Sequence, residues 1–151
     1  KQRRDSTGPL DIPASDLQVS NATPADADAI AAILAADMGL DPVGFDAHVT
    51  ANMARPNYRY YIARQDDAAV GTANVQQLNG DAYIYGFVVR PEARGHGYGR
   101  QIMLHMLNDL AAQGDAPMYL EVVPENTPAV TLYASLGFVP VATFDYYRLD
   151  A

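Results

Sequence analysis

Residues 94–99, with the sequence RGHGYG, form the segment of the chain with the clearest chemical signal. Glycines at alternate positions permit backbone torsions that other residues avoid, and they let a ligand approach the main chain closely. The amides of such a turn can point at one anion, and a helix that starts directly after the turn adds partial positive charge. With Arg94 and Arg100 at its ends, the segment predicts a site for a pyrophosphate. The plain alternative is a turn that only starts a helix.

Two well-known phosphate-binding motifs do not match this segment. A P-loop ends in Gly-Lys followed by Ser or Thr, whereas Gly99 is followed by Arg100 and Gln101. A dinucleotide fingerprint places its third glycine one residue later than this chain does, and it opens the first strand-helix-strand unit of its fold rather than following a run of strands. The segment therefore belongs to neither class.

The elements that must position this segment follow from periodicity, turn signals and caps. Asp66-Asp67 and Asn79-Gly80-Asp81 predict hairpin turns, which implies an antiparallel meander. The strand-helix-strand unit after the meander implies a parallel pair with a right-handed crossover. Strands are expected over 17–22, 58–64, 69–78, 82–90, 118–123, 138–143 and 144–149, and helices over 23–38, 45–55, 97–113 and 127–136. The sequence thus predicts an α/β (α+β) fold with a mixed sheet.

Length and composition predict one domain. The chain has 151 residues, of which 49% are hydrophobic, and residues 17–151 are expected to form that domain after a flexible arm or linker over 1–16. No apolar run is long enough to span a bilayer, and the first residues lack the apolar centre of a secretory signal, so we expect a cytoplasmic protein without membrane contact.

Charge and the missing cysteines exclude several functions. The net charge of -8 argues against general binding to nucleic acid or anionic membranes. The absence of cysteine removes disulfides, thiolate nucleophiles and thiolate metal sites. His48, His96 and His105 show no metal-ligand spacing, so no metal is expected. An acidic body with one local basic loop is suited to an anionic cofactor and a cationic acceptor.

Two motifs of the chain resemble those of the GNAT family of N-acetyltransferases. Residues 88–99 resemble the family's central motif, and its following motif is matched, in order and at the family's spacing, by Leu120-Glu121-Val122, Asn126, Leu132-Tyr133 and Leu136-Gly137-Phe138. The resemblance implies a twisted, mostly antiparallel sheet with a central parallel strand pair and helices on both faces. It also implies acetyl-CoA as co-substrate and transfer of an acetyl group to a primary amine of a small molecule, peptide or protein.

The resemblance also implies a role for each matching residue. Tyr133 matches the tyrosine that protonates the departing thiolate, and Glu121 matches the general base of ribosomal-protein N-terminal acetyltransferases, although other branches of the family place the base elsewhere. Cofactor binding is implied for Phe87, Val88, Val89, Arg94, Gly95, His96, Gly97, Tyr98, Gly99, Arg100 and Asn126. Each of the three polar residues also has a structural interpretation: Tyr133 as a core aromatic, Glu121 as a solvated strand end and Asn126 as a turn residue.

The chemistry of acyl transfer gives independent reasons for these residue types. An amine is mostly protonated at neutral pH, and a nearby carboxylate such as Glu121 can remove its proton before it attacks a thioester. A phenol such as that of Tyr133 can hydrogen-bond or protonate the leaving thiolate. Backbone amides beside a bulge in the central strand would polarise the thioester carbonyl.

The acceptor amine is the part of the reaction about which the sequence says least. Loop 39–44, the turn after residue 78, Tyr83 and Tyr85 are expected to border its site, although most tyrosines of the cluster Tyr58, Tyr60, Tyr61, Tyr83, Tyr85, Tyr146 and Tyr147 are expected to serve strand packing. The main alternative function is a non-catalytic acyl-CoA-binding domain, such as half of a tandem GNAT protein; a nucleotide-binding module is a more distant one. Homodimer formation stays open.

Overall fold

The computed structural model describes residues 1–5, 10, 15–114, 116–123 and 125–141. Its strands are β1 (Gln2–Arg4), β2 (Gln18–Asn21), β3 (Tyr58–Gln65), β4 (Ala68–Leu78), β5 (Asp81–Val89), β6 (Met118–Leu120) and β7 (Val139–Pro140). Its helices are α1 (Ala27–Met38), α2 (Phe45–Met53), α3 (Tyr98–Gln113) and α4 (Thr127–Ser135), and short 3-10 turns precede α1 and α3.

The strands form one mixed sheet in the order β2-β3-β4-β5-β6-β1-β7. Neighbouring strands are antiparallel except β5 and β6, which run parallel. The connection between the parallel strands contains α3, as a parallel crossover requires. The predicted fold class, a mostly antiparallel sheet with a central parallel pair, is therefore confirmed.

Two tight turns shape the β3-β4-β5 meander. Asp66 and Asp67 have φ values of 48° and 68°, and Asn79 and Gly80 have φ values of 52° and 84°. Two consecutive residues with positive φ make the hairpin turn whose twist matches that of the flanking strands. Both predicted hairpins are confirmed, and they carry the chain to β5 in the middle of the sheet.

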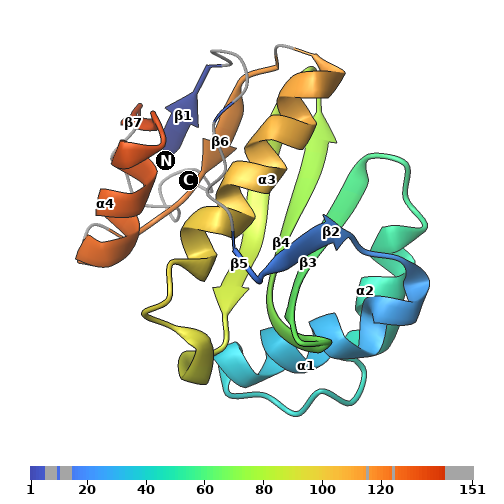
Figure 1. Cartoon of the computed structure of the whole chain (residues 1–151). Coiled ribbons are helices and arrows are strands. Elements are labelled where there is room, and N and C mark those ends of the chain that lie inside the picture. Colours follow the sequence, from blue (N-terminus) through green and yellow to red (C-terminus); the bar gives the residue numbers. More distant parts are fainter. Residues whose placement is uncertain (6–9, 11–14, 115, 124, 142–151) are drawn as a thin grey trace.

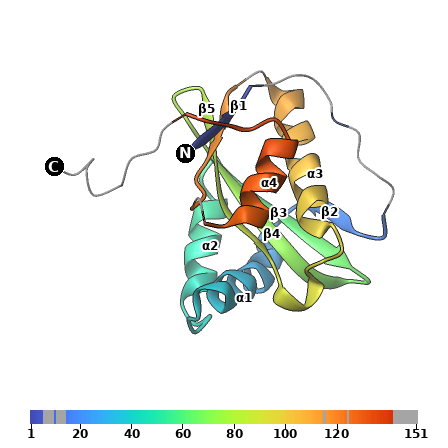
Figure 2. The same cartoon turned by 90° about the vertical axis from the view of Figure 1, so that its left-hand side faces the viewer.

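Helices cover both faces of the sheet, as expected (Figures 1 and 2). On one face α3 buries Ile102, Met103, Met106 and Leu107, and Tyr133 of α4 joins the same cluster. On the other face α1 and α2 pack Ile30 and Val49 against strand β3. The buried side chains of β3 alternate between the two clusters because successive residues of a strand point to opposite faces.

The beginning of the chain corrects one expectation. Within the predicted flexible arm, Gln2–Arg4 form β1, which pairs with β6 on one side and β7 on the other. Arg4 is 3% exposed, its Nε donates a 2.6 Å hydrogen bond to the carbonyl oxygen of Leu136 at the end of α4, and burial lowers its pKa. The strand is made of polar residues and is held by backbone pairing, so apolar periodicity gave no signal for it.

The end of the chain is described only in part. Of the two final strands expected over 138–143 and 144–149, Val139–Pro140 form β7, and the second lies outside the described residues. Strand β6 is shorter than expected and ends at Leu120. In the described part of the chain, no helix combines the length and apolar character needed to cross a membrane.

Candidate active site

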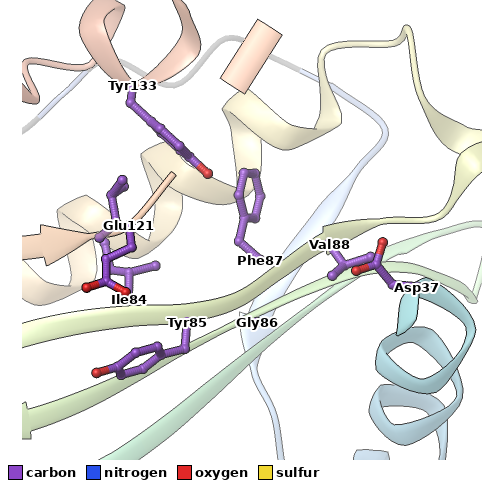
Figure 3. Close-up of a pocket in the computed structure, with 9 residues that line it drawn as sticks. Asp37, Ile84, Tyr85, Gly86, Phe87, Val88, Glu121 and Tyr133 are labelled. Carbon is purple, nitrogen blue, oxygen red and sulfur yellow. The ribbon is translucent and has the colours of Figure 1, made fainter. Parts of the chain in front are cut away.

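A cavity opens where the parallel strands part. Strands β5 and β6 are paired at Ala82 with Met118 and at Tyr83 with Tyr119, but β6 ends at Leu120 while β5 continues to Val89. The cavity has a volume of about 370 Å³ (Figure 3). It is lined by Asp37, Ile84, Tyr85, Gly86, Phe87, Val88, Leu120, Glu121 and Tyr133.

A bulge in β5 forms one wall of this cavity. Between Thr72 paired with Val88 and Asn74 paired with Tyr85, β5 carries one residue more than β4. Gly86 lies in the bulge with a φ of 56°, and a Cβ at this position would come 3.0 Å from the side-chain nitrogen of Asn74. A bulged residue leaves part of the ladder unpaired. The expected bulge is therefore present, and only glycine fits it without strain.

Tyr133 is held by aromatic packing. It is 8% exposed and contacts the rings of Phe87 and Phe138 at centroid distances of 6.3 Å and 5.9 Å. Burial raises the pKa of its phenol to about 12, so the group is a neutral hydrogen-bond donor at physiological pH. In Figure 3 the hydroxyl points toward the space between Phe87 and Glu121. Tyr133 is thus both a core aromatic and a cavity residue.

Glu121 comes directly after β6 and is exposed. Its side chain lies on the cavity wall near Ile84 (Figure 3). Burial and then the charge of Glu121 raise the pKa of the neighbouring Tyr85 phenol. The site therefore offers a solvated carboxylate and a buried phenol on two elements that face one space.

The glycine-rich turn lies beyond the carboxyl end of β5, at the start of α3. Gly95 and Gly97 have φ values of 83° and 76°, and a Cβ on either residue would meet no atom within 4 Å. The turn thus has open space beside Gly95 and Gly97, which leaves room for an anion at the helix start. Gly99 differs: a Cβ there would lie 3.2 Å from Phe87, so this glycine serves packing rather than an unusual torsion.

The other residues of the turn are engaged within the protein. Arg94 donates from Nε to the carbonyl oxygen of Val89 and lies 3.8 Å from Asp37, and Arg100 donates to the Ser135 hydroxyl of α4 at 2.6 Å. The His96 ring stacks on Tyr98, with centroids 5.3 Å apart. Since the Tyr98 side chain is 6% exposed, only its backbone faces the turn.

Asn126 caps α4. Its Oδ1 accepts a 3.3 Å hydrogen bond from the backbone N–H of Ala129, the arrangement expected of an N-cap asparagine. Asn126 thus has a structural role as the N-cap of α4, and its side-chain nitrogen takes no part in this bond.

Asp37 is a cavity residue that sequence reasoning missed. It lies in the last turn of α1, at the Val88 end of the cavity in Figure 3. An acidic residue at the C-terminus of a helix opposes the helix dipole. That local conflict is the signal that could have identified Asp37, because residues that break a local rule often serve a site.

The cavity unites some of the predicted residues and leaves others outside. Phe87, Val88, Glu121 and Tyr133 meet there, while Val89 packs into the α3 side of the core and the glycine turn and Asn126 do not line it. Of the tyrosine cluster, Tyr60 and Tyr61 are buried, Tyr85 lines the cavity, and Tyr83 borders a smaller hollow beside it; Tyr146 and Tyr147 lie outside the described residues. Loop 39–44 and the turn at 79–80 line neither hollow.

Comparison with known proteins agrees with this geometry. The family model described as the acetyltransferase (GNAT) family matches residues 28–138, which include the meander, the glycine turn, Glu121 and Tyr133. The chain belongs to the GNAT family. The expected resemblance is thereby confirmed.

Two curated relatives are named acetyltransferases. The [ribosomal protein bS18]-alanine N-acetyltransferase of Salmonella typhimurium is 33% identical over 73 residues, which cover 48% of this chain and 49% of the relative. The mycothiol acetyltransferase of Streptomyces scabiei is 37% identical over 95 residues, which cover 60% of this chain and 30% of the relative. The match thus spans about half or less of the length of these relatives.

Solved structures share the fold. An aminoglycoside N-acetyltransferase in complex with coenzyme A is 19% identical with a TM-score of 0.76, and the match covers 92% of this chain and 98% of the other. The ribosomal-protein-S18-alanine N-acetyltransferase of Escherichia coli is 24% identical with a TM-score of 0.70, covering 83% and 79%. At these identities the likeness concerns the fold alone.

Proposed function

We propose that this chain is an acetyl-CoA-dependent N-acetyltransferase that moves the acetyl group directly to a primary amine. The observation that carries the proposal is the meeting of Glu121 and Tyr133 in one cavity at the bulge of β5, next to an open glycine turn at a helix N-terminus. A base, a neutral donor and an anion cradle are the three parts that direct acyl transfer from a phosphate-bearing donor needs.

In this proposal the donor is held along β5 and at the start of α3. The backbone of Gly95, Gly97 and the following residues through Arg100 would bind the pyrophosphate, and the backbone of Phe87, Val88 and Val89 would pair with the pantetheine arm. The Asn126 side-chain nitrogen would add one contact from the start of α4. Acetyl-CoA supplies the acetyl group as a thioester, which is the bond that breaks.

Glu121 would act as the base. Its carboxylate takes a proton from the acceptor ammonium, directly or through water, and the freed amine attacks the thioester carbonyl. A carbon–nitrogen bond forms, the carbon–sulfur bond breaks and the nitrogen gives up its second proton to water, so the acetyl group leaves the thiolate without a covalent enzyme intermediate. Backbone N–H groups at the Gly86 bulge would stabilise the negative charge on the carbonyl oxygen.

Tyr133 would stabilise the leaving thiolate by a hydrogen bond. With a pKa of about 12, the phenol is a weaker acid than a thiol such as that of cysteine, whose reference pKa is near 8.5. Complete proton transfer from the phenol would therefore be uphill, and the thiolate takes its proton finally from solvent. The buried hydrogen bond, rather than the acidity of the phenol, is the contribution we assign to Tyr133.

The acceptor class follows from charge and from the relatives. The net charge of -8 and the exposed Glu121 favour a cationic amine. Of the curated relatives named above, one is an alanine N-acetyltransferase of a ribosomal protein and another is named for mycothiol. We therefore propose an amine of a peptide or small molecule as the acceptor.

The experiment is a screen of amines and short peptides for release of free thiol from acetyl-CoA, together with a calorimetric Kd for coenzyme A. The proposal predicts micromolar to millimolar binding and amine-dependent thiol release. Binding without release for any amine would contradict it and favour an acyl-CoA-binding domain. A thermal shift with ATP or NAD but none with acetyl-CoA would contradict both.

A further inference from the structure

Two tyrosines form a stacked pair beside the proposed active site. Tyr83 of β5 and Tyr119 of β6 are directly opposite each other in the parallel pairing, and their rings stack with centroids 5.3 Å apart and planes inclined by 21°. Residues two apart on a strand project from the same face. Tyr85 and Glu121 therefore follow the pair on that face, toward the cavity.

A cation of the chain already rests on this pair. The ammonium nitrogen of Lys1 lies 4.5 Å from the ring centroid of Tyr119 and 5.5 Å from that of Tyr83. The guanidinium of Arg3 lies 5.7 Å from the Tyr119 ring and is paired with Asp5 at 2.9 Å. Aromatic faces attract cations at these distances. The pair is thus arranged to hold a positive charge.

The tyrosine pair borders a small hollow that joins the proposed active site. The hollow has a volume of about 80 Å³ and is lined by Lys1, Tyr83 and Tyr119, together with four residues that also line the larger cavity: Ile84, Tyr85, Leu120 and Glu121. Glu121 is two residues beyond Tyr119, which corresponds to roughly 7 Å along an extended chain. One elongated molecule can therefore reach both places.

We propose that the Tyr83–Tyr119 pair binds a second positive charge of the acceptor, which takes the place of the Lys1 ammonium. This inference rests on the proposed function, with Glu121 deprotonating the amine that reacts. The preferred acceptor is then an amine with a further cationic group about 7 Å away, on a small molecule or on a basic side chain of a peptide. The acidic surface of the protein supports the same charge.

The test compares acceptors that differ only in the second charge. One pair is the 5-aminopentyl-trimethylammonium ion and its isostere 6,6-dimethylheptylamine, which has carbon in place of the quaternary nitrogen, and the other is Ala-Lys amide and Ala-norleucine amide. The readout is the ratio of kcat/KM for the member with the second charge over that for the member without it. For the wild type we expect a ratio of roughly 3 to 30 in at least one pair, the range that cation–π contacts support. The acceptor pair that shows this ratio indicates whether the acceptor is a small molecule or a peptide.

Variants assign the effect to the aromatic faces. Tyr83→Leu and Tyr119→Leu should each lower the ratio toward one, whereas Tyr119→Phe keeps the ring and should keep the ratio. Tyr58→Leu is a matched control, because Tyr58 lines neither hollow and has the guanidinium of Arg55 over its ring at 5.6 Å; it should leave the ratio unchanged. Lys1→Ala removes the competing ammonium and should lower the KM of the member with the second charge.

The outcomes separate the two proposals. If the amines that lack the second charge are acetylated and the wild-type kcat/KM ratio is near one in both acceptor pairs, the inference is overturned and the proposed function stands. If no amine is acetylated, the proposed function fails, and the inference is decided by the calorimetric Kd of the aminopentyl-trimethylammonium ion. Binding that Tyr119→Leu weakens and Tyr119→Phe preserves supports the inference. Equal binding to the wild type and both variants overturns it.

Discussion

The ring of Tyr133 packs against the ring of Phe87, with 6.3 Å between the centroids and 52° between the planes. The end of the Phe87 ring would lie 3.2 Å from a Cβ at Gly99, in the first turn of α3. One phenylalanine therefore touches α4, which carries the phenol, and α3, whose N-terminus carries the glycine turn. The proposed hydrogen-bond donor to the thiolate and the proposed phosphate cradle therefore share one support.

Gly97→Ala tests the cradle. Alanine at a φ of 76° costs about 1–2 kcal/mol of stability, and its methyl group would stand in the turn where phosphate oxygens would meet the amides. We expect the Kd for coenzyme A to rise roughly tenfold to a hundredfold by calorimetry. Gly80→Ala is the matched control, since Gly80 has a φ of 84° and equally open surroundings in a remote hairpin. If both variants change the affinity for coenzyme A equally, the assignment of the glycine turn as the phosphate site is wrong.

Glu121→Gln tests the base. The variant should lower kcat about a hundredfold at pH 7, because the acceptor amine then loses its proton without help. The deficit should shrink at pH 9.5, where more of the amine is already neutral. Glu125→Gln removes an exposed carboxylate four residues along the chain and serves as the control. A deficit of the same size at both pH values would assign proton removal to another group.

The buried phenol of Tyr133 predicts a loss of stability in alkali. Its pKa is about 12 in the folded protein and near 10 in an unfolded chain, so the folded state keeps this proton longer. The stabilisation is complete below pH 10 and is lost as the pH rises toward 12, at up to about 1.4 kcal/mol per pH unit. In urea unfolding, the free energy of unfolding of Tyr133→Phe should fall less steeply than that of the wild type between pH 10 and 11. Between pH 7 and 9 the two free energies should change in parallel. Identical courses throughout would exclude the raised pKa.

Arg4→Met tests the role of β1 in holding α4. The variant leaves the carbonyl of Leu136 without its 2.6 Å hydrogen bond and should cost about 1–3 kcal/mol in urea unfolding. Arg55→Met removes a guanidinium from the helix-strand connection before β3 and is the comparison. Since Tyr133 lies one turn before Leu136, the Arg4 variant should also reduce turnover. Unchanged stability would mean that β1 contributes little to the domain.

The fold was predictable where local signals were strong. Asp66-Asp67 and Asn79-Gly80 are turn pairs whose positive φ values the sequence indicates by residue type alone. The apolar stripe of α3, from Ile102 to Leu110, predicted that helix to within one residue. Strand β1 was missed because its residues are polar and its partners, β6 and β7, are more than a hundred residues away in the chain.

The site was predictable through its motifs and not through its side-chain partners. Glu121 and Tyr133, which the motifs singled out, both line the cavity, whereas the glycine turn lies outside its lining. The position of Asp37 in the cavity depends on the packing of α1 near β5, and the stacking of Tyr83 on Tyr119 depends on the pairing of β5 with β6. No local sequence pattern indicates either contact. Gly99 shares the spacing of the other glycines but serves packing against Phe87, a difference visible only in three dimensions.

The most direct measurement is the single-turnover rate of acetyl transfer by Tyr133→Phe, with the Kd for acetyl-CoA determined on the same protein. Tyr60→Phe, which removes another buried phenol outside the cavity, is the control. We predict a rate roughly a hundredfold below that of the wild type at unchanged Kd, because the hydrogen-bond donor to the leaving thiolate is lost while the binding surface remains. A Tyr133→Phe rate equal to that of the wild type would contradict the catalytic assignment.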